Sequence, residues 1–98
     1  MCIRDRASIA KKYNLIILSD EIYSELCFEG DYQSISNFCP EKTIISTGLS
    51  KWCGAGGWRL GYFIIPNNLN EIKDKINVLA SETFSAVSAP IQLSLIHI

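Results

Sequence analysis

The feature that most constrains the fold is a pair of apolar runs separated by a short glycine-rich loop. The first run, residues 43–47, reads TIIST, and the second, residues 60–65, reads LGYFII and ends at Pro66. Both runs are rich in β-branched and aromatic residues, which favour strands. Because only the loop 48–58 separates them, we expect the two strands to pair antiparallel.

A third apolar run precedes these two. Residues 15–18, LIIL, form a continuous apolar stretch without alternation, which is typical of a strand buried on both faces of a parallel sheet. The segment 21–42 is long enough for the crossover that joins parallel neighbours, which needs about a dozen residues or more. Within it we expect an extended piece at 25–28 and one helical turn at 34–38.

Helix signals flank the predicted strands. Residues 7–13 have the pattern of the last turns of a helix, which Asn14 can end in the left-handed conformation. Asn68 and Glu71 are three residues apart and predict a capping box at the start of a second helix, which should end near Ser85.

The second helix carries an apolar stripe that we expect to pack in the core: Leu69, Ile72, Ile76, Leu79 and Ala80. Another helix should begin at Ala89 and Pro90, since proline favours the first helical position. The pattern shows no internal repeat and no linker. It therefore predicts an α/β arrangement within one domain, with two parallel strands, one antiparallel strand and flanking helices.

Both ends of the chain carry one DNA element read in opposite directions. The codons CTG TCT CTT ATA CAC ATC encode residues 93–98, and their reverse complement, read one base in, encodes residues 1–5. The element resembles a transposon end used in building sequencing libraries. We therefore predict that residues 1–6 and 93–98 are non-native adapter read-through, and that residues 7–92 are an internal fragment of one domain. The only histidine, His97, lies in such an end, so no histidine chemistry is expected.

The charge balance argues against two classes of partner. Without Arg4, Arg6 and Asp5, seven of the nine basic and nine of the ten acidic residues remain, so the net charge is near −2. A basic surface for nucleic acid or for an anionic membrane is therefore not expected. Apolar residues make up 48% of the chain and charged residues 19%, as in a globular core segment. A piece of this length buries too little surface to be comfortably stable alone.

The cysteines do not form a recognisable framework. Of the four cysteines, Cys2 lies in a predicted non-native end. The other three, Cys27, Cys39 and Cys53, are odd in number and match neither a disulfide pattern nor a CxxC metal site, so we expect free thiols in a reducing compartment. No metal site is predicted. No apolar run reaches the eighteen or more residues of a membrane span.

Three charged groups follow the predicted strands. Asp20 and Lys51 come just after the two parallel strands, and Arg59 follows the glycine-rich loop. Ligands of open parallel sheets bind outside the carboxyl ends of the strands, and neighbouring strands lie about 4.8 Å apart. Groups on neighbouring strand ends can therefore bind opposite edges of one aromatic ring. A carboxylate, an amine and a guanidinium together suit a ligand with a basic ring nitrogen, an aldehyde and a phosphate.

The spacing of these residues resembles a known family. Asp20-Glu21-Ile22-Tyr23, then Ser50-Lys51, then Gly57-Trp58-Arg59-Leu60-Gly61 are similar to the class I/II aminotransferases, which are fold-type I pyridoxal-phosphate enzymes. The likeness covers essentially all of residues 7–92. It implies that the segment belongs to the large domain of such an enzyme, which moves an amino group from an amino acid to a 2-oxo acid.

The resemblance also implies a role for each matching residue. Lys51 would bind the aldehyde of pyridoxal 5'-phosphate as an imine and then move the substrate proton. Asp20 would pair with the pyridine nitrogen, and Tyr23 would hydrogen-bond the phenolic oxygen of the ring. Ser50 and Arg59 would hold the phosphate, which suits the arginine fork.

One position departs from the family pattern. Many relatives have a phosphate-binding serine two residues before the serine of Ser50-Lys51, where this chain has Gly48. The glycine can offer only its backbone N–H to the phosphate. We therefore expect Gly48 to contribute to cofactor binding through its backbone alone.

Each site residue has a simpler interpretation when taken singly. Asp20 could be a strand-end turn residue, Lys51 a solvated loop lysine, and Arg59 the partner of a carboxylate. Tyr23 and Trp58 could be core aromatics, which we prefer for Trp58. The joint occurrence at these spacings favours the functional interpretation.

Two other glycine motifs do not match. A dinucleotide fingerprint beginning at Gly54 would need glycine in place of Arg59, and a phosphate loop would need glycine before Lys51.

The resemblance implies a cytoplasmic homodimer with active sites at the subunit interface. Two rival functions remain open. One is another fold-type I reaction, such as that of a carbon–sulfur lyase or a synthase. The other is a non-catalytic descendant or the cofactor-binding domain of a regulator. The segment that fixes substrate choice is expected to lie outside these residues.

Overall fold

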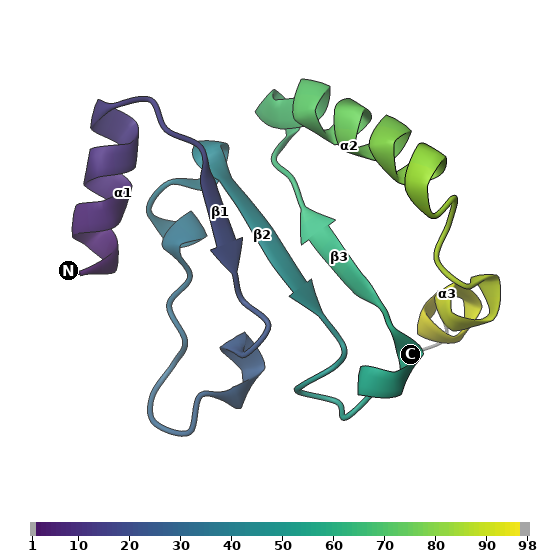
Figure 1. Cartoon of the computed structure of the whole chain (residues 1–98). Helices are drawn as coiled ribbons and strands as arrows, with labels where there is room; N and C mark the ends of the chain where they lie inside the picture. Colours follow the sequence, from purple (N-terminus) through teal and green to yellow (C-terminus); the bar gives the residue numbers. More distant parts are fainter. Residues whose placement is uncertain (1, 97–98) are drawn as a thin grey trace.

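The chain folds around a mixed sheet of three strands. The computed structural model describes residues 2–96, so that Met1, His97 and Ile98 of the predicted non-native ends lie outside the described residues. The strands are β1 (Ile17–Asp20), β2 (Thr43–Gly48) and β3 (Gly61–Ile64), in the order β1-β2-β3 (Figure 1). β1 pairs parallel with β2, and β2 pairs antiparallel with β3. Both pairings confirm the expectation from sequence.

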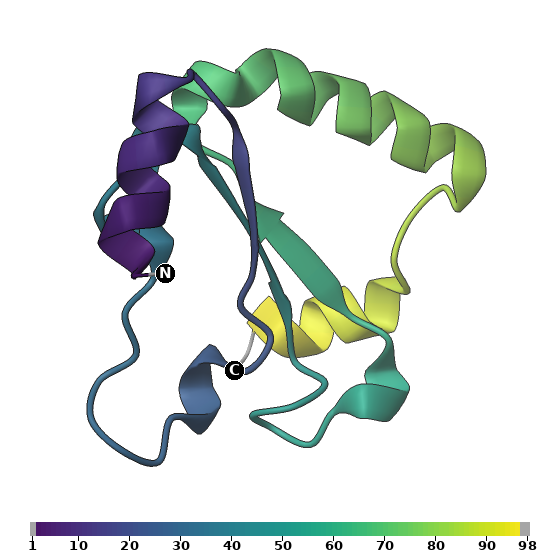
Figure 2. The same cartoon turned by 60° about the vertical axis from the view of Figure 1, so that its left-hand side comes forward.

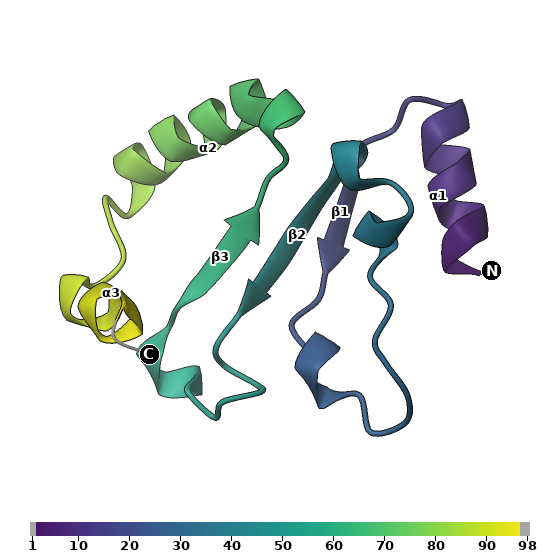
Figure 3. The same cartoon turned by 180° about the vertical axis from the view of Figure 1, so that it is seen from behind.

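Helices lie on both sides of this sheet. α1 (Ile3–Lys12) lies on one side, and α2 (Asn70–Thr83) and α3 (Ala89–Ile96) lie on the other (Figure 2). In the described residues the outer edges of β1 and β3 pair with no further strand, as the view from behind also shows (Figure 3). Short 3₁₀ turns join the elements: Ser24–Leu26, Ile35–Asn37, Pro40–Lys42, Gly56–Trp58 and Asn67–Leu69. The predicted α/β class is confirmed.

The first strand begins two residues later than predicted, at Ile17 and not at Leu15. The reason lies at the end of α1, where Asn14 takes the predicted left-handed conformation with φ 54°. That turn directs the N–H of Leu15 to the carbonyl of Ala10 at 2.8 Å. Leu15 therefore still belongs to the helix cap, which satisfies one of the last carbonyls of α1.

Two local predictions are wrong. Residues 25–28 were expected to be extended, but Ser24–Leu26 is a 3₁₀ turn closed by the N–H of Leu26 on the carbonyl of Tyr23 at 2.9 Å. The capping box at Asn68 does not form, because α2 begins only at Asn70. The side chain of Asn68 instead donates to the carbonyl of Glu41 at 2.6 Å, and Glu71 pairs with Lys75 at 2.8 Å.

The expected helical turn before Pro40 is confirmed. It spans Ile35–Asn37, and the hydroxyl of Ser34 caps it by accepting from the N–H of Ser36 at 3.1 Å. The ends of the last two helices also agree with expectation. α2 ends at Thr83, two residues before Ser85, and α3 begins at Ala89.

The core is small, and its buried residues come from α1, from the segment before β2, from β2 and from the loop after β2. Its buried apolar residues are Ala7, Ala10, Cys39, Ile44, Leu49 and Leu60. Burial raises the pKa of the Cys39 thiol, and the nearby Glu41 carboxylate raises it further. The cysteines in residues 2–96 are free thiols, and no helix in this range has the length and hydropathy to cross a membrane.

The predicted burial is wrong for β1 and for the α2 stripe in this chain, whereas the central strand β2 has no exposed residue, as expected. On one sheet face Leu18 is 68% exposed and Phe63 is 51% exposed, although Ile44 between them is buried. On α2 none of the residues is buried, and Leu79 is 64% exposed. The sequence pattern is that of a covered sheet, but the described residues provide too little second layer to cover it.

The exposed face predicts binding of an apolar dye. We expect the 98-residue chain to enhance the fluorescence of anilinonaphthalene sulfonate, and the double substitution Leu18→Ser, Phe63→Ser to reduce this signal while the far-ultraviolet circular dichroism is kept. The matched variant Ile44→Ser should lose strand signal, because it removes about 2–3 kcal/mol of side-chain burial. Equal dye binding by the double variant and the parent would contradict the assignment of this face as open.

Candidate functional site

The sheet pairing brings the predicted site segments to one edge. Asp20 is the last residue of β1, and the turn that carries Ser50 and Lys51 follows β2. Since β1 and β2 are parallel, their carboxyl ends lie at the same edge. β3 is antiparallel and starts opposite Gly48, so Arg59, just before β3, lies at this edge as well (lower part of Figure 1).

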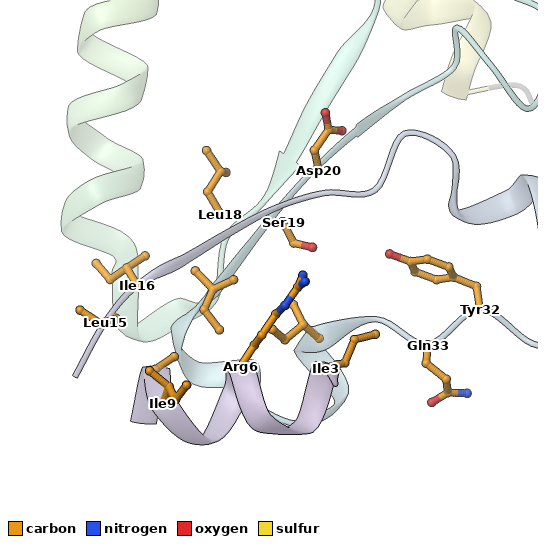
Figure 4. Close-up of a pocket in the computed structure, with 13 residues that line it drawn as sticks. Ile3, Arg6, Ile9, Leu15, Ile16, Leu18, Ser19, Asp20, Tyr32 and Gln33 are labelled. Atoms are coloured by element: carbon orange, nitrogen blue, oxygen red, sulfur yellow. The ribbon is translucent and has the colours of Figure 1, made fainter. Parts of the chain in front are cut away.

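Asp20 presents its carboxylate to solvent. One oxygen accepts from the backbone N–H of Ile22 at 3.3 Å, a short turn that holds the side chain against the start of the next segment. The other oxygen has no hydrogen-bond partner among the described residues. Figure 4 shows Asp20 pointing away from α1, whereas Ser19 points to the opposite face, as alternation along a strand requires.

Tyr23 and Lys51 come from different elements and meet at this edge. The ammonium of Lys51 lies 5.5 Å from the centre of the Tyr23 ring, within the range of a cation–π contact. Lys51 is exposed, and in residues 2–96 its amine has no hydrogen bond or ion pair. The turn around it is closed by the N–H of Gly54 on the carbonyl of Lys51 at 3.3 Å. The ammonium is thus presented on a short turn beside the Tyr23 ring.

Arg59 sits in a conformation that is uncommon for a residue with a side chain. Its φ is 53°, in the left-handed region, and it ends the 3₁₀ turn Gly56–Trp58. The guanidinium is exposed and donates to the carbonyl of Gly56 at 2.9 Å, which leaves its other N–H groups open to a ligand. A left-handed residue other than glycine costs about 1–2 kcal/mol. The fold therefore holds Arg59 at the sheet edge at some cost to stability.

Gly48 is required by a close backbone approach. A Cβ at this position would lie 2.7 Å from the carbonyl oxygen of Leu60 and 3.1 Å from the Cα of Gly61. The approach arises where β2 and β3 meet, next to the hydrogen bond from the N–H of Leu49 to Leu60 at 3.3 Å. A serine side chain at this position would therefore meet the backbone of residues 60 and 61 in this chain. Ser50 lies two residues further on and is half-buried.

A separate hollow of about 580 Å³ lies between α1 and β1. Asp20 lies on its border, and the side chain of Arg6 points into it from α1, opposite the hydroxyl of Tyr32 (Figure 4). Neither Lys51 nor Arg59 lines this hollow. It is therefore distinct from the place where the amine and the guanidinium are presented, and part of its wall is a predicted non-native end.

The sequence interpretation gave no role to Glu21, which the structure buries beside the site. Its side chain is 7% exposed and lies one residue after Asp20. One carboxylate oxygen accepts from the hydroxyls of Ser19 at 3.0 Å and Ser34 at 2.6 Å. Burial raises the pKa of Tyr32, and the Glu21 carboxylate raises it further. The only sequence signal for Glu21 was a carboxylate directly after a predicted strand. Its partner Ser34 is thirteen residues away in the chain, so the sequence does not show the pairing.

The chain is an α/β protein with parallel β1 and β2 and an antiparallel β3. The segments that carry a carboxylate, an amine and a guanidinium end at one edge of this sheet. The family model described as aminotransferase class I and II matches residues 3–98. The chain belongs to this family.

Relatives of known name are similar over most of the chain. A probable aspartate aminotransferase of Methanocaldococcus jannaschii is 39% identical over 75 residues, which is 76% of this chain and 20% of that protein. A probable N-acetyl-LL-diaminopimelate aminotransferase of Bacillus subtilis is 37% identical over 67 residues, or 68% of this chain and 17% of that protein. The chain thus spans about a fifth of the length of these relatives.

A solved structure has the same arrangement of elements. The aspartate aminotransferase of Thermus thermophilus with maleate superposes with a TM-score of 0.83 at 28% identity, and the match covers 92% of this chain and 23% of that one. The strand pairing and helix placement described above are therefore those of part of an aminotransferase.

The close approach at Gly48 predicts a steric defect. Gly48→Ala should lower the free energy of unfolding by about 1–3 kcal/mol, the usual cost of overpacking, as measured by urea denaturation followed by circular dichroism. Gly57→Ala is the matched control, because a Cβ there meets nothing within 4 Å. Equal denaturation midpoints for the two variants would show that β2 and β3 can separate to admit a methyl group.

Proposed function

We propose that the protein containing this segment is a pyridoxal-phosphate-dependent aminotransferase, which transfers an amino group from an amino acid to a 2-oxo acid. The observation that carries the proposal is that the segments with Asp20, Tyr23, Lys51 and Arg59 lie at one edge of the sheet, with Lys51 5.5 Å from the Tyr23 ring, in a chain of the aminotransferase class I and II family. The relatives described above are named aminotransferases, which supports amino transfer over a carbon–sulfur lyase, a synthase or a regulator.

The groups present fit pyridoxal 5'-phosphate. Asp20 has a carboxylate oxygen without a partner in the described chain, which suits a protonated ring nitrogen. Lys51 offers an exposed amine to the aldehyde, and Arg59 has open N–H groups for the phosphate. These are the polar groups that a ring nitrogen, an aldehyde and a phosphate require.

Asp20, Tyr23 and Lys51 each have a separate role in the proposed reaction. The cofactor, when bound, supplies an electron sink that stabilises negative charge at the substrate α-carbon. Asp20 keeps the ring nitrogen protonated, and Tyr23 donates to the phenolic oxygen of the ring. Lys51 would hold the cofactor at its aldehyde and, once the substrate amine displaces it, would move a proton at the substrate α-carbon.

The phosphate is held at the same edge. Arg59 binds it with its guanidinium, Ser50 with its hydroxyl and Gly48 with its backbone N–H. The left-handed conformation of Arg59 supports this role, since strained backbone gathers at functional sites.

The segment forms part of a larger domain in this proposal. Residues 7–92 are the fragment of the large domain that holds the cofactor, and residues 1–6 and 93–98 are adapter read-through, although α1 and α3 run into them. The whole protein is a cytoplasmic homodimer whose active sites lie at the subunit interface. The amino acid and the 2-oxo acid are selected by parts outside this segment. Sequencing of the flanking DNA tests the ends, because it should replace both with other codons.

The role of Lys51 predicts a spectroscopic change. In the full-length enzyme with pyridoxal 5'-phosphate, Lys51→Ala should abolish the absorbance band of the covalent link between the lysine and the cofactor and lower kcat by at least about 10⁴-fold, because the reacting amine is lost. Lys51→Arg keeps the charge and should also lose the band. Lys73→Ala changes an exposed lysine of α2 and should keep both band and rate. A Lys51→Ala variant with the parent band would refute the assignment.

The incompleteness of the site predicts weak binding by the segment alone. The 98-residue chain should bind pyridoxal 5'-phosphate poorly or not at all in equilibrium dialysis, because other parts of the enzyme complete the site. Tight binding of one cofactor per chain would contradict this expectation and would mean that the described edge suffices.

A further inference from the structure

Glu21 is the one charged side chain that the described chain buries. Burying a carboxylate destabilises the fold unless hydrogen bonds compensate for the lost water. Glu21 has such compensation, because the hydroxyls of Ser19 and Ser34 both donate to the same carboxylate oxygen. The Ser34 hydroxyl also contacts that of Ser36 at 2.8 Å. The carboxylate is therefore the centre of a small polar cluster on the α1 side of the sheet.

The backbone of Glu21 is fixed as firmly as its side chain. Its N–H donates to the carbonyl of Ser46 in β2 at 2.8 Å, and its carbonyl accepts from the N–H of Ser24 at 3.0 Å. The hydroxyl of Thr47 lies 3.4 Å from the same carbonyl. Glu21 thus joins three separate parts of the chain: the end of β1, the end of β2 and the turn at residues 34–36.

This attachment determines where the neighbouring site residues point. Glu21 follows Asp20 directly and precedes Tyr23 by two residues. Because adjacent side chains at a strand end point to opposite faces, holding Glu21 on the Ser19 face keeps Asp20 on the other. In contrast, Asp20 and Tyr23 are exposed, so their own side-chain contacts hold them weakly. Displacement of a group by about 1 Å costs up to about 100-fold in rate.

We propose that Glu21 is a positioning residue, which anchors residues 20–23 through Ser19 and Ser34 so that Asp20 and Tyr23 are presented to the cofactor ring. This inference rests on the function proposed above. Glu21 itself touches neither cofactor nor substrate. Its partner Ser34 couples the crossover segment to the site, so that residues far from the ring in sequence determine the geometry around it.

A role in stability alone is the alternative, and the two roles differ in what they change. Loss of an anchor that only stabilises the fold lowers the thermal midpoint and leaves the bound cofactor unchanged. Loss of an anchor that positions Asp20 and Tyr23 changes the electrostatic surroundings of the cofactor ring. The pH midpoint of the visible absorbance band of the cofactor reports those surroundings.

The test compares four variants of the full-length enzyme. Glu21→Ala removes the acceptor, Glu21→Gln keeps an oxygen for both hydroxyls, and Ser34→Ala removes one donor. Glu25→Ala is the matched control, because Glu25 is an exposed glutamate of the same segment with no hydrogen bond in the described residues. Each variant is measured for the pH midpoint of the band, for kcat and KM, and for amide hydrogen exchange of residues 19–24 without cofactor.

We expect Glu21→Ala to move the pH midpoint by about half a unit or more and to lower kcat about 10- to 100-fold, with a smaller change in KM. Hydrogen exchange in residues 19–24 should rise in the same variant. Glu21→Gln should restore most of kcat and most of the parent pH midpoint. Ser34→Ala should give values between those of Glu21→Ala and the parent, and Glu25→Ala should give the parent values.

The inference is overturned if Glu21→Ala lowers only the thermal midpoint and keeps the parent pH midpoint and kcat. It is overturned as well if Glu21→Gln is as impaired as Glu21→Ala, because the anchor requires only an acceptor oxygen. If Glu21→Ala fails to fold, Ser34→Ala replaces it in the test, and a Ser34→Ala variant with the parent pH midpoint and kcat overturns the inference. Failure of the proposed function is distinguishable, because it appears in Lys51→Ala, which would then keep the absorbance band.

Discussion

The parallel register of β1 with β2 is the constraint on which the site depends. Asp20 lies opposite Ser46, and the next residue, Glu21, donates its N–H to Ser46, so the chain leaves β1 while still bound to β2. The turn carrying Lys51 leaves β2 at the same edge. A slip of one residue would turn Asp20 to the α1 face of the sheet and Glu21 to the opposite face, so that the solvated and the buried carboxylate would change places. The polar contacts of Glu21 oppose such a slip.

Most of the strand arrangement was predictable from sequence because short apolar runs and connection lengths carry it. The predictions that failed depended on interactions between distant or competing groups. The capping box at Asn68 does not form, because the Asn68 side chain instead donates to the carbonyl of Glu41, which is distant in sequence. The start of β1 was misplaced because the left-handed Asn14 keeps Leu15 in the helix cap. Burial of Leu18 was misjudged because an apolar pattern does not show whether a covering layer is present.

The candidate site also combines residues that the sequence predicts with contacts that it does not. Asp20, Tyr23, Lys51 and Arg59 were found by their spacing, and the structure gathers their segments at one edge; their roles stay predictions. The steric requirement for Gly48 was not readable, because it comes from the carbonyl of Leu60 across the strand pair. The anchoring of Glu21 was not predictable from sequence either, because no sequence motif links Glu21 to Ser34. Motifs report residues that meet a ligand more readily than residues that support them.

The two strand pairs differ in how much chain must close before they form. β2 and β3 are joined by a short loop, whereas β1 reaches β2 only after the long segment 21–42 has folded back. Loop closure costs more entropy for longer segments, and contacts distant in sequence form more slowly. We therefore expect the β2–β3 hairpin to nucleate folding and β1 to dock last. The turn that carries Lys51 would then form before Asp20 reaches it. Bringing Asp20 and Tyr23 to the edge that already holds Lys51 and Arg59 would be the final step in folding of this segment.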